Sequence, residues 1–274
     1  MPNAVFEANN NINVSIIAFF FIERLYNNLL ILKSPLRNCI VLSLYIEVFC
    51  VNIKGVIGVL IVKVLLFNGS PHKHGCTCTA LEEISKTLKE EGIDSEIYQI
   101  GIKSLTPCRG CGACTSLGKC VINDDDVNNF VEKCRDFDGF IFGSPVHYGS
   151  ASGGITAFLD RAFFSAFMSG RGDVFSYKPA AAIASARRSG TTATLDQLNK
   201  YMTISQMPII SGRYWNMVHG HTPDEVKQDL EGMQNMRILA RNMAWHLKCM
   251  EAGKRAGVPM PKQEEIVFTN FIRG

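Results

Sequence analysis

Short apolar runs alternate with segments of helical periodicity from Lys63 onward, and this alternation constrains the fold more than any other feature of the chain. Five strands are predicted: four from apolar runs, at 63–67, 139–145, 179–186 and 207–211, and one at 95–100, where polar and apolar residues alternate as in a half-buried strand. Helices are predicted at 79–92, 124–137, 154–164, 191–202 and from Pro223 to about Gly253. Such alternation predicts an α/β domain with a doubly wound, five-stranded parallel sheet and helices on both faces.

The first 62 residues differ in composition and are predicted to lie outside this domain. They contain only seven charged residues and are rich in Asn, Ile, Leu and Phe. Their apolar runs, 14–22 and 39–46, end well short of the roughly 20 residues of a membrane span, and Glu7 stands where a signal peptide is basic. Two interpretations stay open for residues 1–62. They are either upstream sequence wrongly joined to a gene that begins near 60–62, or a poorly ordered or membrane-associated extension. Residues 63–274 are the expected domain.

Charge and cysteine content limit the function classes. The chain has a formal net charge of +3 and no run of five like charges, which argues against nucleic-acid binding. Four of its ten cysteines lie between 108 and 120, too close together for a spread disulfide framework. Such clustering indicates metal or redox chemistry in a reducing compartment, so a cytoplasmic protein without a membrane span is expected.

Three loops are predicted to form a ligand site, because ligands of parallel α/β sheets bind beyond the carboxyl ends of the strands. These loops are 68–79, 144–153 and 186–192. The first has the composition of a phosphate cradle, with hydroxyls on Ser70, Thr77 and Thr79, glycines, and a helix beginning nearby. His72 and Lys73 can add charge-assisted hydrogen bonds. The spacing is that of neither a P-loop nor a dinucleotide fold, and an ordinary strand-to-helix turn is the alternative interpretation.

Two motifs in the same order resemble those of the flavodoxin-like NAD(P)H-dependent FMN reductases. The stretch "NGSPHKHGCT" (68–77) is similar to their G-S-P-x-x-x-G-x-T signature, and "GFIFGSPVHYGSASGGITAFLDR" (139–161) to their second flavin loop and the helix after it. This resemblance spans Lys63 to about Phe271 and implies a flavodoxin-like fold, FMN as cofactor and NAD(P)H as co-substrate. The residues it implies for FMN are Ser70, His72, Thr77, Cys78, Thr79, Pro145, Val146, His147, Tyr148, Gly149, Ser185, Arg187, Arg188, Gly190 and Thr191.

Aromatic and basic residues near these loops have two interpretations each. Arg187 or Arg188 could face the flavin, where a guanidinium would stabilise the anionic hydroquinone and raise the potential. Both could equally be solvated or pair with carboxylates. His147 and Tyr148 could stack on or hydrogen-bond the ring, or Tyr148 could only pack. Trp215 is predicted in the core, with closure of a partner subunit's pocket as the alternative.

The segment "PCRGCGACTSLGKC" has the cysteine spacing C-x2-C-x2-C-x5-C. Thiolates are the natural ligands of soft metal centres, and close spacing lets one loop surround them. The pattern resembles that of iron-sulfur flavoproteins, which implies a [4Fe–4S] cluster on Cys108, Cys111, Cys114 and Cys120. Free thiols near the flavin, a zinc ion and a disulfide remain as alternatives. The other cysteines after residue 62 are interpreted as small buried residues: Cys76, Cys78, Cys134 and Cys249.

Together these features predict an FMN-dependent NAD(P)H oxidoreductase. Hydride transfer at flavin N5 would reduce a small-molecule electron acceptor: a quinone, a nitro- or azo-aromatic, free flavin or another acceptor. An electron carrier with an iron-sulfur cluster and no nicotinamide chemistry is the main alternative, and a thiol-based redox sensor is a third. The family resemblance also implies a homo-oligomer.

Overall fold

The computed structural model describes residues 62–267, 269 and 271, so the predictions for residues 1–61 lie outside the described part of the chain. Its elements, in chain order, are β1 (Lys63–Asn68), α3 (Cys76–Glu90), β2 (Asp94–Gln99), α4 (Cys114–Leu117), α5 (Val127–Lys133), the 3-10 helix η1 (Cys134–Asp136), β3 (Gly139–His147), β4 (Ser150–Ala151), α6 (Gly153–Met168), the 3-10 helix η2 (Gly172–Val174), β5 (Ala180–Ala186), α7 (Thr191–Ile204), β6 (Met217–His219), α8 (Pro223–Gln228) and α9 (Leu230–Arg255).

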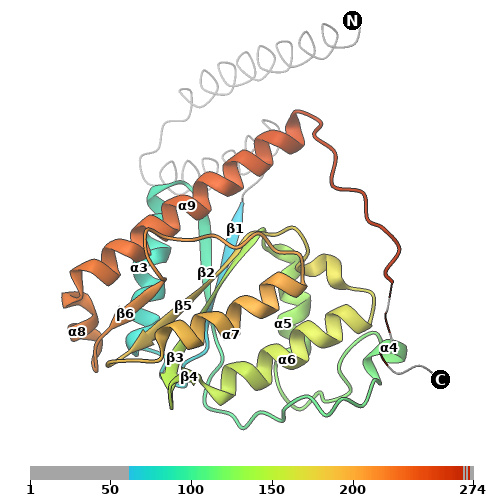
Figure 1. The fold of residues 1–274 in the computed structure, drawn as a ribbon, viewed down its shortest axis with the longest axis horizontal. Coiled ribbons are helices and arrows are strands. Elements are labelled where there is room, and N and C mark those ends of the chain that lie inside the picture. The colour runs from blue at the N-terminus through green and yellow to red at the C-terminus, as the bar shows by residue number, and fades with distance from the viewer. Residues whose placement is uncertain (1–61, 268, 270, 272–274) are drawn as a thin grey trace, which may run out of the picture. The chain divides into compact units, whose positions relative to one another are not determined.

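Five of these strands form a parallel sheet in the order β2-β1-β3-β5-β6 (Figure 1). The two-residue strand β4 pairs antiparallel with the end of β3. After β2 the chain crosses over β1 and continues outward from β3, so the strand order reverses between β1 and β3. In doubly wound sheets, a ligand crevice opens beyond the carboxyl ends of the strands at this reversal. The predicted flavodoxin-like, doubly wound parallel sheet is therefore confirmed.

Helices cover both faces of the sheet, because successive strand residues point to opposite sides. In β1, Val64 and Leu66 pack with α3, α8 and α9, whereas Leu65 and Phe67 pack with α5, α6 and α7. Figure 1 shows these two groups of helices on either side of the strands. The continuous burial of β1 and β5 explains why both read as unbroken apolar runs in the sequence.

The last strand is not the one that the sequence predicts. The segment 207–211 makes only an isolated bridge, in which Ala180 N–H donates to Pro208 and Ile210 N–H donates to Ala180. The fifth parallel strand is β6, ten residues further along, and it pairs with Ala184–Ala186. The Asn216 side chain donates to the Ala182 carbonyl of β5 (3.1 Å). The hydrogen-bonding capacity of this carbonyl is thus satisfied by a polar side chain and not by the backbone of the predicted strand.

The long helix predicted from Pro223 is divided in two at Asp229. This residue ends α8 and caps α9, with its carboxylate accepting from the backbone N–H of Gly232 (2.9 Å). The same carboxylate also accepts from the backbone N–H of His219 (2.7 Å). These two bonds fix a non-helical backbone that apolar periodicity alone does not reveal.

Two burial predictions were wrong. Cys249 is exposed on α9, and Trp215 is 55% exposed, packed edge-on against Tyr214 instead of in the core. Both residues lie on helix or loop faces that turn away from the sheet. No helix in the described ranges combines the length and apolar character that crossing a bilayer requires.

Candidate functional site

The first loop is held in place by two amides at the ends of neighbouring strands. Asn68, at the end of β1, donates to the Gln99 side chain (2.6 Å), and Gln99, at the end of β2, donates to the Ser70 carbonyl (2.7 Å). The Asn68 side-chain oxygen accepts from the Ser70 backbone N–H (3.1 Å). The buried Ser70 hydroxyl in turn accepts from the backbone N–H of His72 (3.1 Å). The loop backbone is thus fixed before any ligand binds.

Helix α3 begins earlier than predicted, at Cys76, and so brings two of the predicted hydroxyls inside the helix. Its N-cap is Gly75, and no side chain caps it, so the first backbone N–H groups are left for a ligand. The Thr77 hydroxyl lies 2.7 Å from that of Ser185. The Thr79 hydroxyl donates to the Gly75 carbonyl (3.2 Å) and is directed back along the helix. Of the two threonines, Thr77 therefore has the better position for an anion.

Cys78 is directed toward a carboxylate. Its thiol donates to Glu82 one turn further along α3 (3.5 Å). Burial and the neighbouring Glu82 raise the pKa of this thiol to about 11. Cys78 is therefore a neutral thiol at neutral pH. His72, by contrast, is exposed at the turn before the helix.

An open pocket of about 580 Å³ lies between the second and third loops, beyond the ends of β3 and β5. The two strands are neighbours in the sheet, with Pro145 opposite Ser185, which brings their loops face to face. A side chain at Gly190 would place its Cβ 2.6 Å from the Cα of Gly149, so the loops touch through two glycines. The cavity lining is Val146, Tyr148, Gly149, Ala186, Arg187, Arg188 and Ser189. Such a volume is typical of a small-molecule or cofactor site.

Two arginines and a tyrosine dominate this cavity. Arg187 and Arg188 are exposed and have no carboxylate partner among the described residues, although both line the cavity. Tyr148 is fully exposed on a left-handed backbone (φ 49°), a conformation that is costly for a non-glycine residue. Thr191 does not line the cavity, because its hydroxyl donates to the Met217 sulfur (3.2 Å).

A second cavity, of about 310 Å³, lies on the other side of the second loop. His147 lines it, together with the first loop, the segment after β2 and the start of α6. Ser152 connects the first loop to α6. Its hydroxyl donates to the Gly69 carbonyl (3.2 Å), and the same hydroxyl caps the N-terminus of α6. Consecutive residues His147 and Tyr148 thus serve different cavities, a separation that the sequence does not indicate.

The four clustered cysteines line one pocket. Cys108 and Cys111 are exposed, Cys120 is half-buried, and Cys114 is buried at the start of α4. Burial, together with the nearby sulfurs of the other three, raises the pKa of Cys114. Converging thiolates repel one another, so the set favours either protonation or a bound cation. The same pocket is lined by Arg109, Gly112, Val121, Ile122, Arg161, Phe164 and Ser165.

The spacing of these sulfurs bears on the kind of metal centre they fit. In the described part of the chain, the one group of three or more potential ligand atoms all within 4.8 Å of one another is His74, Cys78 and Glu82. Sulfurs around a single zinc ion lie roughly 3.8 Å apart, given Zn–S bonds of about 2.3 Å. No three of the four cysteine sulfurs in the described structure lie all within 4.8 Å of one another, and none of these cysteines forms a disulfide. An all-thiolate set of this spacing fits a polynuclear iron-sulfur cluster better than one ion.

Sequence reasoning missed the buried residues that support the cysteine segment. Asp125, within the helix predicted at 124–137, forms an ion pair with Arg161 of α6 and also accepts from the backbone N–H of Val127 (3.2 Å), and the Asp125 and Arg161 side chains are almost fully buried. The helix N-cap is Asp126, whose side chain makes no cap bond. The run of three aspartates at 124–126, shortly after the last of the clustered cysteines, was the available signal, but the partner of Asp125 lies 36 residues further along the chain.

Comparisons with known proteins agree with this geometry. The family model of the NADPH-dependent FMN reductases matches residues 62–222. An iron-sulfur flavoprotein of Methanocaldococcus jannaschii is 30% identical over 194 residues, covering 69% of this chain and 99% of the relative. An iron-sulfur flavoprotein of Methanosarcina thermophila is 27% identical over 195 residues, covering 70% and 98%.

Solved structures with the same fold share little sequence. The crystal structure of RosB with a bound 8-demethyl-8-formylriboflavin-5'-phosphate intermediate has a TM-score of 0.54 at 14% identity, covering 77% of this chain and 92% of RosB. A flavone reductase has a TM-score of 0.51 at 19% identity, covering 69% of this chain and 64% of its own. The extent of the family match, the fold and the order of the loops lead to one conclusion: the chain belongs to the NADPH-dependent FMN reductase family, whose members are FMN-binding oxidoreductases.

Proposed function

We propose that this chain is an FMN-dependent NAD(P)H oxidoreductase that passes electrons to a small-molecule acceptor. The observation that carries the proposal is the meeting of three loops at one edge of the sheet. An uncapped helix N-terminus lies at the first loop, and a pocket between the second and third loops is lined by two arginines that have no carboxylate partner in the described part of the chain. The helix N-terminus suits a phosphate, and the two cations suit a ring system that gains negative charge on reduction.

On this proposal, one group of residues binds the FMN phosphate and a second group surrounds the ring system. Ser70, Thr77 and the first backbone amides of α3 would bind the FMN phosphate. Val146, Tyr148 and Gly149 would flank one side of the ring system, with Arg187 and Arg188 at the other. When bound, FMN supplies a ring that accepts a hydride and releases electrons singly or in pairs. The side chains bind and orient it, and a guanidinium stabilises negative charge on the ring.

A second function is favoured by the cysteine pocket. We infer that Cys108, Cys111, Cys114 and Cys120 hold a [4Fe–4S] cluster, because the four thiols line one pocket and, in the described structure, no three of their sulfurs lie all within 4.8 Å of one another as they would around a single ion. When bound, such a cluster transfers one electron at a time. The chain would then exchange electrons with a protein or small-molecule partner. Two curated relatives carry the name iron-sulfur flavoprotein, which supports this inference.

Protein purified without oxygen tests both functions. FMN, iron and acid-labile sulfide are counted per chain, and FMN bleaching is followed after mixing with NADPH or NADH. Rapid bleaching with turnover of a quinone supports the oxidoreductase. About four irons and four sulfides per chain support the cluster. Bound cluster with no bleaching by either nucleotide would leave electron carriage as the function. Absence of bound FMN contradicts the oxidoreductase, and absence of iron and sulfide contradicts the cluster.

The expected homo-oligomer belongs to the same proposal. Trp215 and Tyr214 are half-exposed beside a small pocket that includes Met217 and His219. An exposed aromatic pair is a common anchor of protein interfaces, and here it would contact a second copy of the chain. Sedimentation at micromolar concentration should show a dimer or larger species, and Trp215→Ala should weaken it. A monomer under these conditions contradicts the expectation.

A further inference from the structure

Arg161 is a fully buried cation aimed at the segment that carries the cysteines. It lies on α6, and its side chain is 0% exposed. Asp125, its one carboxylate partner, has a side chain that is 5% exposed. A buried arginine is costly unless every donor has an acceptor, so the direction of each N–H group is informative.

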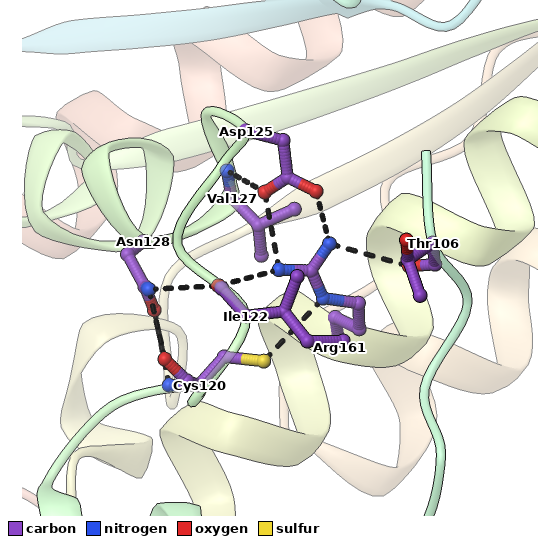
Figure 2. A network of polar contacts seen from close by, with 7 residues as sticks. All are labelled: Thr106, Cys120, Ile122, Asp125, Val127, Asn128 and Arg161. Carbon is purple, nitrogen blue, oxygen red and sulfur yellow. Dashed lines mark hydrogen bonds and ion pairs between the residues drawn. The ribbon is translucent and has the colours of Figure 1, made fainter. Parts of the chain in front are cut away.

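The guanidinium donors are divided between a carboxylate, two carbonyls and a sulfur (Figure 2). Nη1 and Nη2 both donate to Asp125, the second at 3.1 Å. Nη1 also donates to the Thr106 carbonyl (3.2 Å), and Nη2 to the Ile122 carbonyl (2.8 Å). The remaining donor, Nε–H, is directed at the Cys120 sulfur, 3.4 Å away. The bidentate carboxylate fixes the guanidinium plane, which leaves Nε–H no other direction.

Cys120 is held at its backbone as well as at its sulfur. Asn128 of α5 accepts from the Cys120 backbone N–H (3.0 Å) and donates to the Cys120 carbonyl (3.0 Å) and the Ile122 carbonyl (3.2 Å). Figure 2 shows Asn128 and Arg161 on opposite sides of this segment. Cys108 and Cys111, which line the same pocket, are exposed. Cys120 is therefore fixed at both its backbone and its sulfur, unlike the exposed Cys108 and Cys111.

We propose that Arg161 is a positioning residue that donates a permanent hydrogen bond to the Cys120 sulfur and raises the reduction potential of the cluster bound there. The proposal rests on the proposed [4Fe–4S] function of the four cysteines. One-electron reduction by an external reductant adds negative charge that is shared with the ligand sulfurs. A donor to one sulfur stabilises that reduced state more than the oxidised one, so the potential increases.

Two substitutions with opposite expected signs test this role. Arg161→Lys keeps the positive charge, but one ammonium group does not reproduce the planar fork that serves Asp125 and Cys120 together. The cluster potential should shift downward. Asp125→Asn keeps Arg161 and its Nε–H donor while removing the compensating negative charge, so the potential should shift upward. A merely structural role of the pair predicts cluster loss in both variants and no shift of opposite sign.

The measurement is a redox titration of the holoprotein, with the reduced cluster followed by electron paramagnetic resonance and FMN followed separately by absorbance. Asn128→Ala is the matched control, because it loosens the Cys120 backbone without removing the donor to sulfur. It should lower cluster occupancy and leave the potential of the remaining cluster unchanged. If Arg161→Lys does not retain a cluster, an unchanged potential in Asp125→Asn would still overturn the role of Arg161.

The possible outcomes distinguish failure of the cluster function from failure of the role of Arg161. Wild-type protein with FMN and no iron overturns the cluster function, and with it the role of Arg161. Wild-type protein with a full cluster, and variants whose potentials equal its own, overturns only the role of Arg161. Opposite shifts in Arg161→Lys and Asp125→Asn, with an unchanged FMN potential, are the expected result.

Discussion

The hydroxyl oxygens of Thr77 and Ser185 lie 2.7 Å apart, and both side chains are buried. Thr77 belongs to the first turn of α3 and Ser185 to the end of β5, 108 residues further along the chain. This bond joins the loop proposed for the phosphate to the loop proposed for the ring. Because one hydroxyl donates to the other, the second keeps its own proton for a bound anion.

Thr77→Val should weaken FMN binding about tenfold. The substitution removes a hydroxyl proposed to contact the phosphate and leaves the Ser185 hydroxyl buried without its partner, and a hydrogen bond to a charged group contributes roughly 1.5–3 kcal/mol. Thr87→Val is the matched control, since Thr87 is buried on the same helix and its hydroxyl donates only to the Glu83 carbonyl. Fluorescence titration of apoprotein with FMN measures both. Equal affinities in the two variants contradict a phosphate role for Thr77.

Replacement of Arg187 or Arg188 by Ala should lower the reduction potential of bound FMN. A guanidinium beside the ring stabilises the anionic hydroquinone, and an exposed charge contributes roughly 0.5–1 kcal/mol, or about 10–20 mV for a two-electron couple. The two arginines control for each other, because one of the single variants should carry most of the shift. Lys200→Ala, an exposed cation on α7, should leave the potential unchanged. Unchanged potential in the double variant would show that neither arginine faces the ring.

Gly190→Ala should destabilise the protein and reduce FMN binding. Gly190 has φ 92°, and an added Cβ would lie 2.6 Å from Gly149 Cα, so the two loops would be forced apart. Left-handed backbone costs an alanine roughly 1–2 kcal/mol, and overpacking adds roughly 1–3 kcal/mol. Gly92→Ala isolates the first contribution, because Gly92 has φ 77° and nothing within 4 Å of the added Cβ. Thermal unfolding and FMN titration compare the two variants. Equal losses of stability and of FMN affinity would contradict the close approach of Gly190 to Gly149.

Cys78 should resist alkylation at pH 8 and react faster as the pH rises toward 11. Burial and Glu82 raise the pKa of its thiol from 9.0 to about 11, so only about a thousandth is thiolate at pH 8. Folding therefore contributes stability through this thiol below about pH 9, and the contribution is lost as the pH approaches 11. Exposed Cys249 is the internal control. Mass spectrometry after iodoacetamide treatment gives both rates, and similar rates at pH 8 would show that Cys78 is accessible and ionised.

A chain that begins at Val62 should bind FMN with the same stoichiometry as the full chain. The three loops and both core layers of the described structure come from residues after 62, and the family match begins there. FMN content and the midpoint of thermal unfolding are measured for both chains. Loss of FMN from the shorter chain would show that residues 1–61 contribute to the site.

The alternation of apolar runs and helical periods was enough to predict the fold, because a strand buried on both faces leaves a continuous apolar stretch. The same pattern misplaced the last strand. There the Asn216 side chain, not an apolar run, satisfies β5. It also missed the helix break at Asp229, where one carboxylate caps α9 and holds His219. Local periodicity records which face of an element is buried and carries no information about a single polar contact.

For the candidate site, too, the sequence predicted local features and did not predict tertiary contacts. Motif spacing by itself predicted which loops and which four cysteines belong to the site, because neighbouring residues of one loop stay close together after folding. Only the tertiary structure decided that Thr77 meets Ser185, that His147 and Tyr148 line separate cavities, and that Arg161 donates to Cys120. Each of these relationships depends on a side-chain direction or on the packing of elements distant in the chain. Hydrogen bonds form over about 3 Å, so they are determined only once the elements have packed.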